Sequence, residues 1–119
     1  MKVKMAETMQ TGINVKTLRS QVGFSQEQLA RLVGASWVTV SRWERSLAKP
    51  NPETQARLRR LSKLVQRVGN ALPPDDLYRF LDTPHRLLRG HRPVDLLQND
   101  YSFEDLLAFV ESAKSGDMA

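Results

Sequence analysis

The sequence predicts an all-α fold. Apolar residues recur three and four positions apart along most of the chain, which is the spacing of one helix face, and no segment alternates as a strand does. Asn or Ser precedes several of these segments and Gly follows them, as at the capped ends of helices. The chain has 119 residues, 40% of them hydrophobic, which suffices for one ordinary domain or two very small ones.

Three short helices are expected first. Residues 1–13 show no clear period and predict a flexible N-terminal arm before them. In the second helix, Ser25 and Gln28 match a capping box, and Gly34 supplies the left-handed residue that ends it. The expected N-caps of the three helices are Asn14, Ser25 and Ser36, and the helices end at Gly23, at Gly34 and near Glu44.

A long helix is expected to follow, with a boundary after it. Pro52 suits its first position. Its apolar stripe consists of Leu58, Leu61, Leu64, Val65 and Val68, and its basic face of Arg57, Arg59, Arg60, Lys63 and Arg67. Gly69-Asn70 and Pro73-Pro74 then mark a boundary. We therefore predict one helical domain over residues 14–70 and a second over residues 73–119.

The second domain is expected to contain short helices. Asp75 and Asp76 suit a helix start, because carboxylates stabilise helix N-termini, and Thr83-Pro84 ends that helix. A short helical segment is expected over 94–97, and Ser102 is expected to cap the last helix. Residues 73–119 contain more apolar residues than so short a segment can bury by itself, so part of them should pack on the first domain, a second subunit or another protein.

Charge is divided unevenly between the two parts. The net charge is +5, with a pI near 10.0. Residues 1–72 carry 13 Lys and Arg against 4 Asp and Glu, whereas residues 73–119 carry 5 against 9. This asymmetry predicts that the first part binds nucleic acid and that the second does something else. The alternative is that the basic side chains only form a solvated helix face.

The composition argues against several other classes. There is no cysteine and there are two histidines, so disulfides, a zinc site and any other cofactor are not expected. No apolar run approaches the roughly 20 residues of a membrane span. We expect a cytoplasmic protein with no membrane partner, associated with the nucleoid when bound to DNA. The acidic residues, His85 and His91 fall in no catalytic motif, so an enzyme is not expected.

The segment from Phe24 to Glu44 has the features of a DNA-reading helix pair. Ala30 allows two helix backbones to approach, and Gly34 forms the turn between the helices. With the spacing of Gln26, Leu29, Val40 and Trp43, this segment resembles the Xre/Cro/C1 helix-turn-helix family, over about residues 15–64. The resemblance implies a structural ion pair between Arg19 and Glu44. It fails at Ser46, where the family often has Gly.

The same resemblance implies a set of DNA contacts. Gln26, at the start of the second helix, is expected to bind a phosphate. Arg42 suits a bidentate contact to guanine, and Val38 and the methyl group of Thr39 suit a thymine methyl. Trp37 either reads bases or packs on the first helix or a dimer partner, whereas Trp43 is expected in the core. The base-reading candidates are Ser36, Trp37, Val38, Thr39 and Arg42, and the candidates for backbone contacts are Ser41, Arg45 and Lys49.

A second resemblance covers about residues 75–119. Thr83-Pro84, the run Gly90-His91-Arg92-Pro93-Val94-Asp95-Leu96-Leu97, the helix at 103–113 and Gly116 resemble the C-terminal domain of the Xre/MbcA/ParS antitoxins. Arg89 stands where a second Gly is frequent. The resemblance implies an antitoxin, commonly dimeric, that neutralises a co-encoded toxin, often a RES-domain enzyme that degrades NAD. Such a protein also binds its own operator DNA and represses its operon.

The resemblance further implies how the toxin is held. The C-terminal helix and tail, residues 111–119, would cover the active-site cleft of the toxin, and Gly90 and Pro93 would shape a turn. The polar toxin contacts are expected at Arg89, Arg92, Lys114 and Asp117, although each is also explained as ordinary surface. The competing interpretation is a phage- or plasmid-type repressor whose C-terminal half only dimerises.

Overall fold

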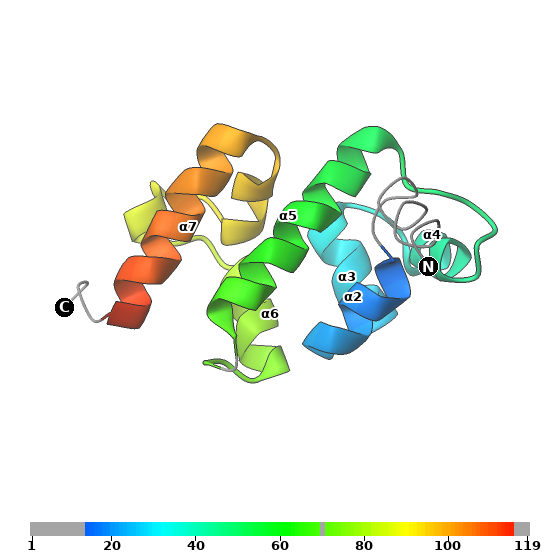
Figure 1. The fold of residues 1–119 in the computed structure, drawn as a ribbon, viewed down its shortest axis with the longest axis horizontal. Helices are drawn as coiled ribbons and strands as arrows, with labels where there is room; N and C mark the ends of the chain where they lie inside the picture. The colour runs from blue at the N-terminus through cyan, green and yellow to red at the C-terminus, as the bar shows by residue number, and fades with distance from the viewer. Residues whose placement is uncertain (1–13, 70, 116–119) are drawn as a thin grey trace, which may run out of the picture.

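The fold is all-α, as the sequence predicts. The computed structural model describes residues 14–69 and 71–115, and within these ranges it contains six α-helices, two short 3-10 segments and no strand (Figure 1). The helices are α2 (Val15–Val22), α3 (Gln26–Val33), α4 (Trp37–Glu44), α5 (Pro52–Val68), α6 (Pro74–Asp82) and α7 (Asp100–Ser115). The 3-10 segments are η1 (Arg86–Leu88) and η2 (Pro93–Leu97). The predicted arm over residues 1–13 lies outside the described residues.

The predicted helix ends of the N-terminal part are confirmed. The Asn14 side chain accepts a hydrogen bond from the Thr17 backbone N–H at 2.9 Å. Ser25 and Gln28 form the complete capping box, with both bonds present. Gly34 has a φ of 73° and ends α3 in the left-handed conformation. These caps satisfy backbone groups that a helix end leaves without partners.

One predicted cap is wrong. The last helix begins at Asp100, not after Ser102, and Asn99 is the residue that caps it. The Asn99 side chain accepts from the Ser102 backbone N–H at 2.9 Å, which makes Ser102 the third residue of the helix. Both residue types are good N-caps, so the choice between them depends on where the preceding η2 segment delivers the chain.

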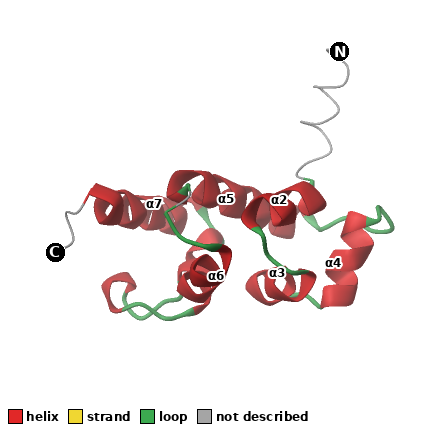
Figure 2. Cartoon of the chain, turned by 90° about the horizontal axis from the view of Figure 1, so that it is seen from below, coloured by secondary structure: helices red, strands yellow, loops and turns green. Residues whose placement is uncertain are grey.

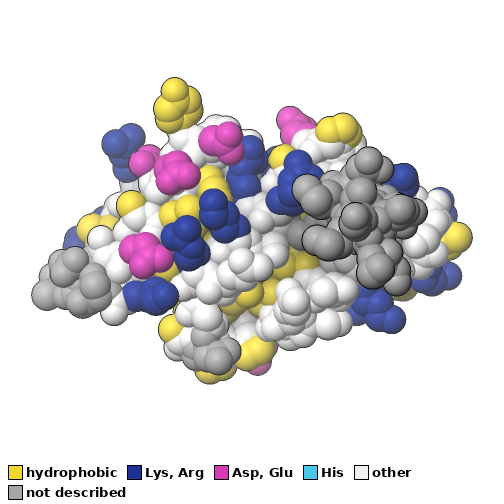
Figure 3. Space-filling view, viewed as in Figure 1, with side chains coloured by type: hydrophobic (Ala, Val, Ile, Leu, Met, Phe, Trp, Pro, Cys, Tyr) yellow, Lys and Arg dark blue, Asp and Glu magenta, His cyan; other side chains and the backbone are white. Residues whose placement is uncertain are grey.

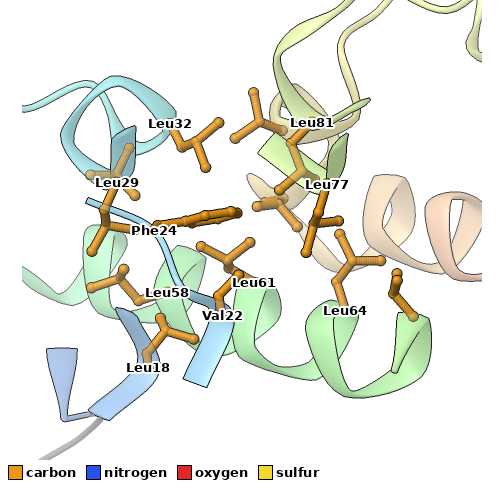
Figure 4. Close-up of a cluster of buried hydrophobic side chains, with 14 of the residues drawn as sticks. Leu18, Val22, Phe24, Leu29, Leu32, Leu58, Leu61, Leu64, Leu77 and Leu81 are labelled. Atoms are coloured by element: carbon orange, nitrogen blue, oxygen red, sulfur yellow. The ribbon is translucent and has the colours of Figure 1, made fainter. Parts of the chain in front are cut away.

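A single apolar core joins the two parts of the chain. Side chains from α2, α3 and the α2–α3 turn face α5, and Leu77 and Leu81 of α6 point into the same cluster (Figure 4). Phe24, which is 2% exposed, points toward Leu77 of α6 and also makes an edge-to-face contact with Tyr78. The predicted boundary is therefore a turn in the chain but not a gap in the core. Whether either part folds by itself stays a prediction.

Gly23 shows how closely the two parts approach. A Cβ atom at Gly23 would lie 2.9 Å from Cγ of Pro74, the first residue of α6, and the glycine has a φ of 84°. Both facts require glycine here, because the conformation is left-handed and the space is already filled. The end of α2 thus packs directly against the start of α6.

Part of the basic face of α5 is covered by α7. Arg60 donates to the carboxylate of Asp100 at 3.1 Å and to the backbone oxygen of Leu97 at 2.9 Å. Arg67 pairs with Glu111 at 3.4 Å. Basic and acidic side chains accordingly lie next to one another over α5 and α7 (Figure 3). Two of the arginines that the charge pattern offered as nucleic-acid ligands therefore hold the acidic half in place.

The molecule is elongated, with different elements at its two ends. It measures 46 × 32 × 25 Å, with α4 near one end and α7 with the 3-10 segments near the other (Figures 1 and 2). In the described ranges no helix combines the length and the hydropathy needed to cross a bilayer.

Candidate nucleic-acid and protein interfaces

The α3–α4 pair has the geometry of a helix-turn-helix. Ala30, which is 3% exposed, lies where α3 approaches its neighbours, and its backbone oxygen accepts from Ala35 N–H at 2.9 Å across the turn. Ser36 caps α4 by accepting from the Thr39 backbone N–H at 3.1 Å. Val40 is fully buried under α4, so the opposite side of this helix faces solvent. The second helix of the pair is thus held by one short turn and one buried contact.

The implied ion pair between Arg19 and Glu44 is confirmed. Arg19 Nε and Nη2 donate to the two carboxylate oxygens of Glu44 at 2.5 and 3.0 Å, and Arg19 Nη1 donates to the Phe24 backbone oxygen at 3.0 Å. The Glu44 side chain is only 5% exposed. The hydrogen bonds from Arg19 lower the pKa of Glu44, against the opposing effect of burial. This pair ties the end of α4 to α2.

Gln26 takes part in the same network. Its side-chain amide donates to Glu44 Oε1 at 3.1 Å, so one of the two amide hydrogens is used within the fold. The sequence predicts a phosphate contact for this residue, and the structure adds a structural role that the sequence did not reveal. The backbone N–H groups at the start of α3 remain the part of this site best suited to an anion.

The exposed face of α4 carries most of the predicted DNA contacts. Trp37 is 51% exposed and Val38 is 47% exposed. The alternatives for Trp37, which are base reading, packing on the first helix and a dimer contact, stay predictions. Ser36 is occupied by capping and by a 3.0 Å hydrogen bond to Thr39 Oγ1. The other candidates are Arg42, Arg45 and Lys49, which are exposed, and Thr39 and Ser41, which are half-buried.

Near the end of α4, the expectation for Trp43 is confirmed, whereas the turn that was expected to differ at Ser46 is retained. Trp43 is partly buried and packs against the core, as predicted. Ser46 adopts a φ of 61°, so it occupies the left-handed position that the family fills with Gly. Its N–H bonds to the Trp43 oxygen at 3.1 Å, and the N–H of Leu47 bonds to the Arg42 oxygen at 2.8 Å. This is the Schellman pattern, so the turn is retained although the residue differs.

Two of the predicted toxin contacts are used inside the fold. Arg92 donates to Asp82 at 2.7 Å and to Asp95 at 2.9 Å. Hydrogen bonds from Arg92 lower the pKa of Asp95. Asp82 also accepts from Arg31 of α3 at 2.8 Å, so this network joins the two parts of the chain. Lys114 donates to the backbone oxygen of Arg67 at 2.7 Å, which docks the end of α7 on α5.

The other two predicted contacts have different positions. Arg89 is exposed and forms no ion pair within the described residues. Its φ of 60° repeats the situation of Ser46, because it also stands at a position where the resembling family has Gly. Asp117 lies outside the described residues. Among the polar predictions, Arg89 is thus the one that faces solvent without an internal partner.

An apolar surface lies in this half, where the sequence predicts more apolar residues than the segment can bury by itself but does not identify the exposed ones. Leu87, on η1, is 58% exposed, whereas its neighbour Leu88 is 7% exposed. The rings of Phe80, His85 and Phe109 meet beside it. The signal in the sequence was the pair Leu87-Leu88, since adjacent residues of one short 3-10 turn point in different directions. No group of three or more potential metal ligands occurs in the described part of the chain.

Comparison with known proteins finds relatives that match both parts of the chain. A family described as "Helix-turn-helix domain" matches residues 10–72. The "Probable mycobacterial cidal antitoxin Rv3188" of Mycobacterium tuberculosis is 34% identical over 94 residues, covering 79% of this chain and 79% of that protein. The chain belongs to the helix-turn-helix family of mycobacterial cidal antitoxins. A match of this length cannot fit within residues 1–72, so it includes part of the C-terminal half.

Further members of this antitoxin family show the same extent of similarity. The "Mycobacterial cidal antitoxin MbcA" of Mycobacterium tuberculosis and that of Mycobacterium bovis are each 27% identical over 96 residues, covering 81% of this chain and 84% of those proteins. A chain in the crystal structure of the M. tuberculosis MbcT–MbcA toxin–antitoxin complex superimposes with a TM-score of 0.68 and 25% identity, covering 89% of this chain and 95% of that one. The family likeness therefore includes the acidic half as well as the helix-turn-helix.

Proposed function

We propose that this chain is the antitoxin of a toxin–antitoxin pair: it neutralises its toxin by protein–protein binding and represses its own operon through the helix-turn-helix. The observation that carries the proposal is the similarity to a toxin-bound antitoxin along 89% of the chain, which exceeds the helix-turn-helix match at 10–72. A plain DNA reader needs only the matched segment. The proposal assigns the chain no catalysis of its own.

The DNA-binding part of the proposal rests on the exposed face of α4. We propose Arg42, Val38, Thr39, Trp37 and Ser36 for base reading and Gln26, Ser41, Arg45 and Lys49 for the phosphate backbone. The exposed arginines and lysine at this end attract the backbone, whereas the short Thr39 and the fork-shaped Arg42 on α4 suit contacts to base edges. If the protein is a homodimer, as proposed, two half-sites about one helical turn apart should be protected.

The toxin is proposed to bind the C-terminal half. Of the four polar contacts first expected, Arg89 fits this role best, because Arg92 and Lys114 already bond within the fold. The proposed toxin is a RES-domain enzyme that degrades NAD. The similarity to a cytoplasmic class of regulator adds a cytoplasmic location to the proposal.

Co-expression with the product of the neighbouring gene tests the proposal. The two proteins should co-purify, and cells that express the neighbour alone should stop growing and lose NAD, whereas cells that express both should not. Gel-shift titration of this chain against its own upstream DNA should show binding that scrambled DNA does not. If the neighbour neither binds nor inhibits growth while the upstream DNA is still bound, the repressor interpretation replaces the antitoxin.

A short C-terminal deletion tests whether the tail contacts the toxin. Removing residues 111–119 would also remove Glu111 and Lys114, which dock α7 on α5. Removing residues 116–119 leaves both contacts in place. If the tail covers the active site of the toxin, the chain without 116–119 should lose neutralisation while keeping its fold and its DNA binding. A shortened chain that still protects cells would contradict the tail contact.

A further inference from the structure

Three rings from separate segments meet on the surface of the C-terminal half. Phe80 of α6 and Phe109 of α7 stack with their centroids 6.2 Å apart and their planes 9° apart. His85, from the loop before η1, meets Phe109 edge-to-face at 4.9 Å. All three side chains are only half-buried. Aromatic rings that stack and still face solvent keep a large apolar area available for a partner.

A hollow lies on each side of these rings. One, of about 580 Å³, is lined by Leu87, Leu96, Ala108 and Phe109 among others. The other, of about 390 Å³, is lined by Leu72, Phe80 and His85 among others. Leu87 and Leu72 are 58% and 38% exposed and stand at the rims. We call the three rings and these two hollows the aromatic face.

The rim of the aromatic face is basic on the η1 side, whereas Asp105 of α7 lines the same hollow as Arg89. Arg86 and Arg89 are both exposed, and neither forms an ion pair within the described residues. The other arginines of this half, Arg79 and Arg92, are paired with carboxylates. A partner that places apolar side chains in the hollows and a carboxylate near the rim would match this surface in shape and in charge.

We infer that the aromatic face is the docking surface for the toxin, with Leu87 as its central anchor and Arg89 as its charged contact. The inference rests on the proposed function and names the site by which that function is performed. The toxin contacts predicted from the sequence were polar. The aromatic face instead offers an apolar centre with arginines at its rim. The face lies on α6, η1 and α7, away from α4, so a toxin bound there leaves the DNA-reading helix open (Figures 1 and 2).

The toxin is a better-supported occupant of the aromatic face than a second copy of this chain. The likeness to a chain of a toxin–antitoxin complex covers 89% of this chain, so it includes most of the C-terminal half that carries the face.

The test measures binding of the full-length chain to the purified product of the neighbouring toxin gene, with its active site inactivated. Leu87→Asp should weaken binding at least about tenfold, because docking would bury an unpaired carboxylate. Ala108→Arg, on an exposed helical position in the larger hollow, should do the same by filling it. Leu47→Asp is the matched control, since Leu47 is 56% exposed at the other end of the molecule.

The binding results distinguish a failure of the aromatic face as the docking surface from a failure of the antitoxin function. Weaker binding by Leu87→Asp and Ala108→Arg, with Leu47→Asp at wild-type affinity and all circular dichroism melts alike, supports the aromatic face. Wild-type affinity for both variants overturns it and leaves the antitoxin function standing. A wild-type chain that does not bind the toxin refutes the function itself. If the two variants bind the toxin normally but change from dimer to monomer in light scattering, the occupant is a second copy and the inference is wrong.

Discussion

The two ends of the molecule expose different chemistry. At the α4 end, Arg42, Arg45 and Lys49 are exposed, and polar residues such as Thr39 lie on the same helix as the exposed Trp37 and Val38. At the η1–α7 end, the accessible groups are aromatic rings and Leu87. A nucleic-acid partner is bound through its phosphates and base edges. A protein partner is bound mainly through apolar surface that is removed from contact with water. The difference between the two ends supports the proposal that DNA and the toxin bind at different ends of the chain.

The two ends nevertheless share one apolar core. The largest effect is therefore expected from a substitution in this core, because it should disturb both ends at once. Leu61 on α5 is fully buried. We expect Leu61→Ala to lower the free energy of unfolding by about 2–5 kcal/mol, through lost burial and the cavity left behind. Both DNA and toxin binding should then weaken together at elevated temperature. Leu87→Ala, at an exposed position, should cost far less stability.

Two spectroscopic signals test whether the two parts unfold together. Both tryptophans, Trp37 and Trp43, lie in the helix-turn-helix, so their fluorescence reports that part alone, whereas far-ultraviolet circular dichroism reports all helices. For a shared core the two unfolding transitions should coincide, in the wild type and in Leu61→Ala. Separate transitions would show that residues 14–70 and 73–119 fold as independent domains.

The second prediction acts on the helix-turn-helix end alone. Glu44→Gln should cost about 2–3 kcal/mol at pH 7, because Arg19 loses its ionic partner in a mostly buried site. The folded pKa of Glu44 lies below its ordinary 4.5, so the unfolded state binds more protons and stability rises with pH in that range. The contribution is present above about pH 4.5 and is lost as pH falls through the folded pKa.

Denaturant titrations of wild type and Glu44→Gln at pH 7 and at decreasing pH check this. The stability difference should shrink as the solution is made more acidic than pH 4.5, the ordinary pKa. The exposed pair Asp76–Arg79 is the control, and Asp76→Asn should change stability by less than about 1 kcal/mol. A Glu44→Gln difference that stays constant with pH would contradict the role of the charge.

The third prediction tests whether changes at the α4 end affect DNA binding without affecting toxin binding. Arg42→Ala should reduce discrimination between operator and scrambled DNA by about 1–3 kcal/mol, because a bidentate contact to guanine is lost. Lys49→Ala should weaken both DNA affinities alike and lower the salt dependence, as expected for a phosphate contact. Neither change should alter toxin affinity. An unchanged ratio of specific to non-specific binding in Arg42→Ala would refute base reading by this residue.

The smallest predicted effect compares the same change at both ends. Ser46 and Arg89 each adopt a φ near 60°. Glycine removes the strain of the left-handed conformation but has more backbone freedom to lose, so Ser46→Gly and Arg89→Gly should each stabilise by about 0.5–1 kcal/mol. Arg89→Gly should also weaken toxin binding, whereas Ser46→Gly should not. Thermal melts and toxin titrations measure the two effects separately.

The helix positions could largely be predicted because their signals are local. A cap is a bond between residues three or four apart, so Ser25 and Gln28 predict their own contact whatever surrounds them. Resemblance supplied the Arg19–Glu44 pair, which spans 25 positions and has no local signal. The cap of α7 was misplaced because Asn99 and Ser102 suit the role equally, and the packing of η2 decides between them.

The candidate protein interface was less predictable, since it depends on packing between distant segments. Arg92 and Lys114 have the sequence features of free surface cations, yet Asp82 and the Arg67 oxygen accept from them. Phe80 and Phe109 are 29 positions apart and form one stack only because the tertiary packing brings these positions of α6 and α7 together. Half-buried rings of this kind cannot be distinguished from core residues by periodicity.

The sequence by itself determined the all-α class, the helix order and the DNA-reading segment. Each of these depends on spacing within one or two turns of helix, where caps and apolar stripes act without help from distant residues. Only the tertiary structure decided that both parts share one core, that Arg60 and Arg67 hold α7, and that three rings form an exposed face. Those outcomes depend on the angles at which helices pack, because the angle selects which side chains meet and which remain in water.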